Sequence, residues 1–392
     1  RRRKLTEQSH SRITINPTIP DTSGKAVHII RSLSVGGVES LLARVLPLMP
    51  TNRYTPHVIC TESLGVNAQF LIDAGVTVEL ISVPKRTHPI GIWRLARRLR
   101  QLQPRVVHSH MFASNVTATI AAHLGVRHTP MICHIHMVNE WGSPSRIKTE
   151  LRLDRWRKKY IVVSQDCKNY MGQHLGGINE EKIAVLLNSA GALPPPTESK
   201  EAMRRLLGIP TDAQVIGMVA RLDEEKGPDV LLQACTKLFA ENHDNRRLLV
   251  VGGKYLDRYQ QLAKDLGIEK LVYFAGEQLD VSNYYAAMDL LAVPSRQEAF
   301  GLVLVEAMQF GLPIVASNVG GIPEVARDGK EALLIPPEDP DKLADAITML
   351  LENPPLAATL GQNGLKRAGD FAPQVYVERL CDIYDSVLMT HF

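Results

Sequence analysis

The chain has 392 residues, of which 45% are hydrophobic and 22% are charged, and this balance is ordinary for a globular protein. Single hydrophobic cores stop growing at about 250–300 residues, so the length predicts two domains. The formal net charge of +4 is too small to indicate a nucleic-acid partner, and no apolar run approaches the roughly 18 residues that cross a bilayer.

Residues 1–24 begin RRRKLTEQSHSR and develop no hydrophobic segment, so we expect a flexible basic tail and not a secretory signal. The cysteines are widely spaced and form no C-x-x-C pair, which indicates a reducing compartment and disfavours a disulfide framework or a zinc site. These cysteines are Cys60, Cys133, Cys167, Cys235 and Cys381. Together these features predict a cytoplasmic protein.

From residue 25 onward, short β-branched runs alternate with helical patterns. Strands are predicted at 26–30, 57–61, 76–81, 105–110, 130–136 and 159–164. The helices predicted between them include 38–49, 67–74, 90–103 and 114–124. Such βαβ alternation is typical of a doubly wound parallel sheet.

Three successive prolines at 194–196 disfavour regular structure and indicate a linker. The alternation then restarts, with strands predicted at 214–220, 247–253, 271–276, 290–295, 313–317 and 332–336. The sequence therefore predicts two Rossmann-like α/β domains, 25–194 and 195–373, that face a cleft. The last helix, within 374–392, has amphipathic spacing and is expected to pack back on the first domain.

The stretch SRQEAFGLVLVEAMQFG (295–311) carries two carboxylates, Glu298 and Glu306, in an otherwise apolar run. It follows a predicted strand and enters a helix at about 300–302, whose first amides attract an anion or sugar hydroxyls. Glu298 lies just before this helix and Glu306 about one and a half turns inside it, so both can face one ligand. For an arbitrary pair of glutamates, the alternative is a capping acid and a solvated helix position.

Arg221 and Lys226 lie in the loop after strand 214–220, at the carboxyl edge of a parallel sheet, where ligands bind. Two cations in such a loop suit a diphosphate. Gly36 and Gly37 follow the first strand, and their missing Cβ atoms let backbone amides approach a ligand. Each feature alone is weak evidence.

Taken in order, these features resemble the retaining glycosyltransferases of family 4, which have the GT-B fold. The resemblance runs from residue 26 to about 375, and its most specific parts are the E-x7-E spacing and the Arg-x4-Lys loop. The stretches that carry it include VVHSH (106–110), ICHIH (132–136), ARLDEEKGPDVLL (220–232) and EAFGLVLVEAMQFGLPIVAS (298–317).

The resemblance implies that Arg221 and Lys226 hold the diphosphate of a nucleotide-sugar donor and stabilise the departing nucleotide. Glu298 is expected to bind the sugar, with Glu306 on the ribose hydroxyls and His136 on the sugar and acceptor side. The other expected donor contacts are Gly36, Gly37, Phe300, Gly301 and Leu302, with the base met by the backbone near Leu279.

The implied reaction moves a hexosyl or N-acetylhexosaminyl group from a UDP- or GDP-sugar to a glycan or lipid-linked acceptor, in cell-surface polysaccharide, lipopolysaccharide or glycolipid assembly. Catalysis by electrostatic stabilisation of the leaving phosphate needs no cofactor and no divalent metal. Histidines 108, 110, 134 and 136 lack carboxylate or thiolate companions at zinc spacing, so we expect no metal site there. The one D-x-D, 339–341, is expected to start a helix.

Two alternatives stay open: a nucleotide-sugar-binding protein with weak or lost catalysis, and a nucleotide-sugar epimerase or phosphorylase on the same fold. The segment 188–191 reads Asn-Ser-Ala-Gly where family members commonly read Asn-Gly-Val-Asp, which slightly favours the first alternative. The complete set of Arg221, Lys226, Glu298 and Glu306 weighs against it.

Basic residues gather in segments 85–105 and 146–160. One interpretation is peripheral contact with anionic lipid at the inner face of the plasma membrane. The other is that helix 90–103 is an ordinary amphipathic helix whose apolar face packs on the sheet, which the spacing of that face fits well.

Overall fold

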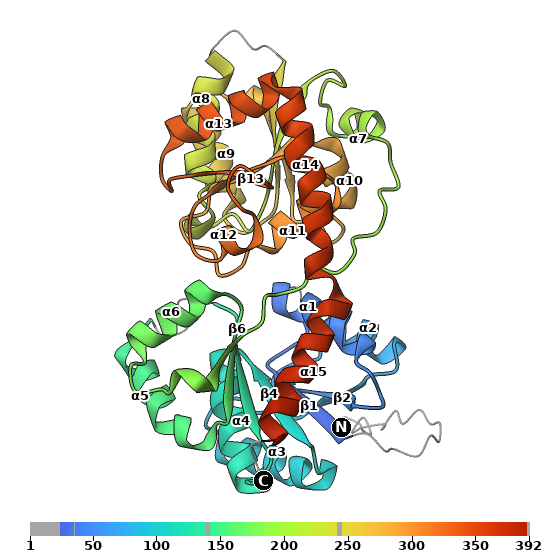
Figure 1. The fold of residues 1–392 in the computed structure, drawn as a ribbon. Helices are drawn as coiled ribbons and strands as arrows, with labels where there is room; N and C mark the ends of the chain where they lie inside the picture. Colours follow the sequence, from blue (N-terminus) through green and yellow to red (C-terminus); the bar gives the residue numbers. More distant parts are fainter. Residues whose placement is uncertain (1–23, 35, 138–141, 241–244, 390–392) are drawn as a thin grey trace, which may run out of the picture.

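The computed structural model describes residues 24–34, 36–137, 142–240 and 245–389. The predicted basic tail lies outside the described residues apart from residue 24. Two α/β domains lie one above the other in Figure 1, and the described chain both begins and ends in the lower one. Each contains one parallel sheet, which confirms the predicted fold class.

The seven-stranded sheet of the first domain has the order β3-β2-β1-β4-β5-β6-β7. Its strands are β1 (Gly24–Ile30), β2 (Tyr54–Cys60), β3 (Thr77–Leu80), β4 (Val106–His110), β5 (Met131–Ile135), β6 (Lys159–Val162) and β7 (Ile183–Val185). The sequence predicts no strand at β7, because three residues are too few to show a hydrophobic period.

The six-stranded sheet of the second domain has the order β10-β9-β8-β11-β12-β13. Its strands are β8 (Gln214–Val219), β9 (Arg246–Val251), β10 (Val272–Gly276), β11 (Leu290–Val293), β12 (Ile314–Ser317) and β13 (Ala332–Ile335). All six coincide with predicted strands to within two residues at each end. The segment 186–199 between the two sheets has no helix or strand, in keeping with its prolines.

Helices cover both faces of the first sheet. Those on one face are α1 (Gly37–Val45), α2 (Asn67–Asp73) and α15 (Pro373–Met389), and those on the other include α3 (Pro89–Leu102), α4 (Met111–Gly125) and α6 (Gln165–His174). The short helix α5 (Pro144–Leu153) packs beside α4. The apolar side of α3 packs into the core through Ile92, Leu95 and Leu99, so the prediction of an ordinary amphipathic helix is confirmed.

The second sheet is covered in the same way. One face carries α8 (Pro228–Ala240), α9 (Leu256–Asp265) and α13 (Pro340–Glu352), and the other carries α7 (Lys200–Leu207), α10 (Ser282–Ala287), α11 (Leu302–Gln309) and α12 (Ile322–Val325). No helix in the described part of the chain combines the length and the apolar character that a bilayer span requires.

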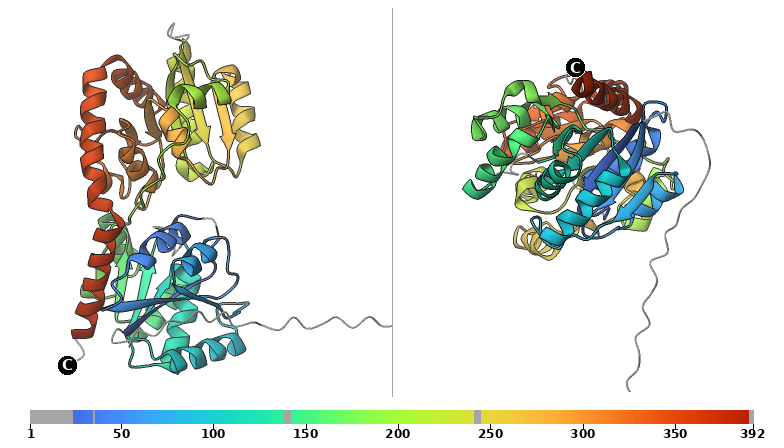
Figure 2. Two further views of the ribbon diagram at one scale, coloured as in Figure 1. Left: turned by 90° about the vertical axis from the view of Figure 1, so that its right-hand side faces the viewer. Right: turned by 90° about the horizontal axis from the view of Figure 1, so that it is seen from below.

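The end of the chain returns from the second domain to the first. Helix α14 (Pro354–Ala368) packs on α11, and α15 continues from it down the first domain, as the left view of Figure 2 shows. Tyr376, Leu380 and Tyr384 of α15 are buried against the first sheet, and Asp385 pairs with Arg53. This helix therefore ties the two domains together.

The strand orders decide where a ligand can bind. Each sheet reverses its winding once, between β1 and β4 in the first domain and between β8 and β11 in the second. The crevice outside the carboxyl ends of the strands at such a switch point is the usual ligand site of an open parallel sheet. In this chain the loops that follow β1, β8 and β11 all reach one cavity.

Candidate active site

A cavity of about 580 Å³ lies between the two domains. The first domain contributes the start of α1 and the ends of β4 and β5, while the second contributes the loop after β8 and the stretch 292–303. The site residues predicted from sequence that line it are Gly36, Gly37, His136, Arg221, Lys226, Glu298, Phe300, Gly301, Leu302 and Glu306. Residues more than 250 positions apart in sequence thus share one chamber.

The two predicted cations lie in the loop after β8. The side chain of Arg221 is 60% exposed and lies 3.2 Å from a carboxylate oxygen of Asp223. Lys226 is more enclosed, and its Nζ donates to Oε2 of Glu298 at 2.6 Å. One predicted cation is therefore already paired with one of the predicted carboxylates.

Helix α11 presents its first amides to the cavity. Its N-cap residue, Gly301, has φ of +92°, and no side chain in the described part of the chain caps the helix. The preceding loop is braced from behind, because Gly321 N–H donates to the carbonyl of Glu298 at 2.9 Å. A Cβ on Gly320 would lie 1.9 Å from that same carbonyl oxygen, so only glycine allows this close approach. The uncapped helix start is suited to an anion.

Glu306 lies on α11, facing the cavity, and accepts a hydrogen bond of 2.9 Å from the hydroxyl of Tyr285. Burial raises the pKa of Glu306, while the Tyr285 hydrogen bond and the positive charge of Arg44 on α1 act in the opposite direction. The side chain is partly buried at the cavity wall and not solvated on the helix surface. The Tyr285 and Arg44 contacts come from elements distant in sequence, and the sequence analysis did not predict them.

Gly36 and Gly37 lie at the start of α1, on the opposite wall. A Cβ on Gly37 would lie 3.4 Å from Cδ1 of Leu302, so α1 and α11 approach each other closely across the cavity. Glu39, in the first turn of α1, also lines the cavity, and burial raises its pKa. The first turn of α1 thus brings a carboxylate that the sequence analysis did not include.

His136 follows β5 and is the member of a histidine cluster that reaches the cavity. Its Nε2 lies 3.2 Å from Nδ1 of His110. Burial lowers the pKa of His136, and likewise that of His28 farther inside, to about 3. The imidazole at the cavity wall is therefore neutral at physiological pH and can donate one hydrogen bond and accept another.

Comparison with family models finds a match for each of the two domains. Residues 35–189 match the model described as Glycosyltransferase Family 4, and residues 199–367 match the model described as Glycosyl transferases group 1. Each domain thus matches a family model of glycosyltransferases.

The chain is 38% identical over 204 residues to D-inositol 3-phosphate glycosyltransferase of Corynebacterium jeikeium, a match that covers 50% of this chain and 48% of that protein. A protein of the same name from Saccharomonospora viridis is 38% identical over 197 residues, 47% of this chain and 46% of that protein. The chain thus matches about half the length of these curated relatives.

The fold is shared over a longer span. Anabaena HepE, crystallised with UDP and glucose, superimposes with a TM-score of 0.81 at 22% identity, covering 93% of this chain and all of that one. A glycosyltransferase of Rickettsia africae superimposes with a TM-score of 0.79 at 20% identity, covering 93% and 99% of the two chains. At these identities the comparison establishes the GT-B architecture.

Leu279 is the one predicted donor contact that does not line the cavity of this glycosyltransferase fold. Its side chain is 89% exposed, because the loop after β10 turns it to solvent. Glu277, two residues earlier, does line the cavity. The predicted role for this loop was a backbone contact with the base, and it stays a prediction.

The unusual segment 188–191 anchors the junction between the domains. Asn188 lines the cavity, and the hydroxyl of Ser189 donates to the carbonyl of Phe371 at 2.7 Å. A Cβ on Gly191 would lie 2.3 Å from Cδ of Arg44, the residue whose charge reaches Glu306. An alanine at Gly191 would therefore force the Arg44 side chain to move.

The D-x-D sequence has a structural explanation. Asp339 caps α13, accepting a hydrogen bond of 2.9 Å from the Lys342 amide, which confirms the predicted helix start.

The conformation of Gly301 gives a direct test of this site. A Cβ there would lie 2.6 Å from Cδ1 of Leu304, in addition to the cost of about 1–2 kcal/mol for a side chain in the left-handed region. Gly267 has φ of +71° with open space around it, so Gly267→Ala measures the backbone cost alone. In urea unfolding we expect Gly301→Ala to lose more free energy of unfolding than Gly267→Ala. Equal losses would contradict the tight packing of the α11 start.

Proposed function

We propose that this chain is a retaining glycosyltransferase that moves a hexosyl or N-acetylhexosaminyl group from a UDP- or GDP-sugar to a glycan or lipid-linked acceptor. The setting we propose is the assembly of cell-surface polysaccharide, lipopolysaccharide or glycolipid. The observation that carries the proposal is that the cations Arg221 and Lys226, the uncapped start of α11 and the carboxylates of Glu298 and Glu306 line one chamber between the domains.

The arrangement suits departure of a nucleoside diphosphate. As the bond to the sugar breaks, negative charge develops on the β-phosphate, and fixed positive charge near it lowers the barrier. Arg221 and Lys226 supply two full charges, and the first amides of α11 supply the partial charge of a helix N-terminus. We therefore propose that transfer requires no divalent metal at the diphosphate.

The carboxylates suit the two sugars of the donor. Glu298 lies beside Lys226, next to the proposed phosphate position, where it can accept hydrogen bonds from hydroxyls of the transferred sugar. Glu306 lies on α11 itself, where it can accept two ribose hydroxyls. Gly36, Gly37 and His136 approach the donor from the first domain.

UDP is the first nucleotide to test, because HepE, of the same fold, was crystallised with UDP-glucose. The acceptor panel includes D-inositol 3-phosphate, because the curated relatives carry that name. A binding protein without transfer and an epimerase are the competing outcomes of the same assay, which detects product and any change of the donor sugar.

The decisive assay measures glycosyl transfer from UDP- and GDP-sugars to this acceptor panel. We expect Lys226→Ala to lower kcat about 100- to 1,000-fold, the effect of removing one preorganised charge-stabilising donor. Glu298→Gln is expected to lose transfer activity while its affinity for UDP changes less than its activity does, because the proposed contact of Glu298 is with the sugar. NMR of the product is expected to show retention of the anomeric configuration.

The matched control is Lys237→Ala, a half-exposed lysine on α8 that pairs with Asp345. This variant is expected to keep full activity. If no donor is bound or consumed, or if Lys226→Ala and Glu298→Gln behave like the control, the proposed function is wrong. An inverted product would refute retention alone.

The raised pKa of Glu306 predicts how UDP binding changes with pH. Because burial favours the protonated carboxyl, lowering the pH protonates Glu306 sooner than an exposed glutamate and weakens its hold on the ribose hydroxyls. Tyr285→Phe removes a hydrogen bond that favours the carboxylate, so the loss is expected to begin at higher pH. Calorimetric titration with UDP between pH 8 and 5 measures this, with Tyr284→Phe as the control. If UDP affinity falls over the same pH range in Tyr285→Phe and in Tyr284→Phe, Glu306 is excluded from the binding site.

We also propose peripheral contact with anionic membrane lipid through segments 85–105 and 146–160. With its apolar side packed in the core, α3 leaves Trp93 58% exposed and Arg94 and Arg97 on the surface. The guanidinium of Arg97 lies over the Trp93 ring at 5.7 Å, a basic and aromatic pair suited to a headgroup region.

Flotation with vesicles tests the membrane contact. Binding is expected to vesicles that contain phosphatidylglycerol and not to pure phosphatidylcholine, to weaken with salt, and to fall in the triple variant Trp93→Ala, Arg94→Ala, Arg97→Ala. Equal binding to both vesicle types, or full binding by the triple variant, would refute it.

A further inference from the structure

Five histidines lie together on one face of the first sheet. They come from three neighbouring strands and the residue after β5, in the core layer that contains α1 and α15, and the structure buries all of them. His28 on β1 is the register partner of His108 on β4, and His110 is the partner of His134 on β5. With His136 they form a line of imidazoles from the cavity into the core.

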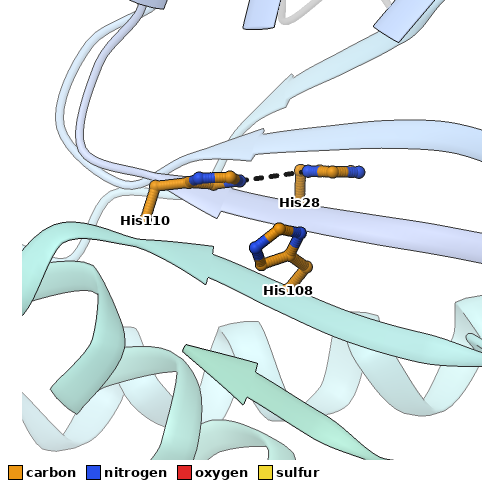
Figure 3. A group of neighbouring side chains, drawn as sticks. All are labelled: His28, His108 and His110. Atoms are coloured by element: carbon orange, nitrogen blue, oxygen red, sulfur yellow. Dashed lines mark hydrogen bonds between the residues drawn. The ribbon is translucent and has the colours of Figure 1, made fainter. Parts of the chain in front are cut away.

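The inner three, His28, His108 and His110, present ring nitrogens to one point. Nδ1 of His28 lies 3.1 Å from Nε2 of His110, and the two rings face each other through these atoms in Figure 3. His108 lies beside both rings, and one ligand nitrogen from each of the three is within 4.8 Å of the other two. The Nε2 atom of His108 is buried and has no hydrogen-bond partner among the described residues. Hydrogen bonding within the described protein therefore leaves this nitrogen unsatisfied.

The remaining nitrogen of each ring has a partner. Nδ1 of His108 lies 2.7 Å from the hydroxyl of Tyr384, and Nε2 of His28 lies 3.4 Å from the same hydroxyl. Nδ1 of His110 lies 3.2 Å from Nε2 of His136. Metal-binding histidines have this pattern, in which the nitrogen facing away from the metal is held by a hydrogen bond that fixes the tautomer and the ring orientation.

We propose that His28, His108 and His110 bind a divalent transition-metal ion of the zinc class, through Nδ1 of His28 and Nε2 of the other two. Two nitrogens on a tetrahedral zinc ion are about 3.3 Å apart, close to the spacing of His28 and His110. An all-imidazole set suits Zn²⁺, Co²⁺, Ni²⁺ or Cu²⁺ and disfavours Mg²⁺ and Ca²⁺, which prefer oxygen. Water or hydroxide would complete the coordination.

From the sequence alone, no metal is expected at histidines 108, 110, 134 and 136, because no carboxylate or thiolate accompanies them. Two structural facts change the argument: His28 joins the cluster from a strand 80 residues away, and a tyrosine of α15 supplies the outer hydrogen bonds. Neither is visible in the spacing of VVHSH and ICHIH.

The proposed ion has a structural role and lies deeper than the proposed donor site. It links β1 to β4 directly and reaches α15 through Tyr384, and α15 is the helix that returns from the second domain. Metal binding therefore stabilises the packing of α15 on the first domain. The roles proposed for Arg221, Lys226, Glu298 and Glu306 do not involve this ion.

The test begins with the full chain stripped of metal by chelator. We expect equilibrium dialysis to give one Zn²⁺ per chain, Zn²⁺ to raise the melting temperature, and Co²⁺ to give the visible absorption of a tetrahedral site. Tyr384→Phe keeps the ring and removes only the hydroxyl, and is expected to weaken Zn²⁺ binding 10- to 100-fold. His108→Asn is expected to weaken it by at least as much.

Two controls make the result specific. His174→Asn changes an exposed histidine on α6 and is expected to bind Zn²⁺ like the unmodified chain. His134→Asn removes a member of the second possible trio, His110, His134 and His136, and leaves all three proposed ligands in place.

Sub-stoichiometric Zn²⁺ with no tetrahedral Co²⁺ spectrum overturns the proposal, and so does unchanged affinity in Tyr384→Phe. Loss of binding in His134→Asn with retention in Tyr384→Phe would assign the ion to the other trio and refute this one. If His108→Asn does not fold, Tyr384→Phe and the Co²⁺ spectrum still decide whether the ion binds to the proposed trio. Transfer activity is not a readout here, so failure of this proposal is distinct from failure of the proposed function.

Discussion

Parallel strands joined by crossover helices bring every loop that follows a strand to one edge of the sheet, and here two such edges meet. The cavity exists because the switch point of each sheet opens toward the other. Gly37 after β1 therefore meets Leu302 at the start of α11, although more than 260 residues separate them. The position of the site is therefore set by the topology of the two sheets and not by any single side chain.

Each of the two predicted cations has a carboxylate partner before a ligand arrives. Lys226 is paired with Glu298, and Arg221 lies near Asp223. A diphosphate that binds Lys226 would replace the Glu298 carboxylate as the ion-pair partner of this lysine. The carboxylate would then be available to accept hydrogen bonds from hydroxyls. Glu306 differs, because its partner is the neutral hydroxyl of Tyr285 and its environment favours protonation. The two glutamates of one helix start thus have distinct electrostatic settings, which suits distinct roles.

The sequence was sufficient for every strand except β7 and for most of the cavity. Strand positions follow from short apolar runs, and residues after strands, such as Arg221 and Glu298, had to lie at the ligand edge. What it could not provide were contacts between elements far apart in the chain. Tyr285 reaches Glu306 from another helix, Arg44 influences Glu306 from the other domain, and His28 joins His108 only through strand pairing. The direction of the Leu279 side chain depends on the loop conformation, which the hydrophobic periodicity of the sequence does not predict.

A crystal structure of the chain with UDP tests most directly where the nucleotide binds in the cavity between the domains. We predict that the β-phosphate contacts Lys226 and the first amides of α11, and that the ribose hydroxyls face Glu306. UDP bound outside the cavity between the domains, or bound within it with Glu306 facing no ligand atom, would contradict the account.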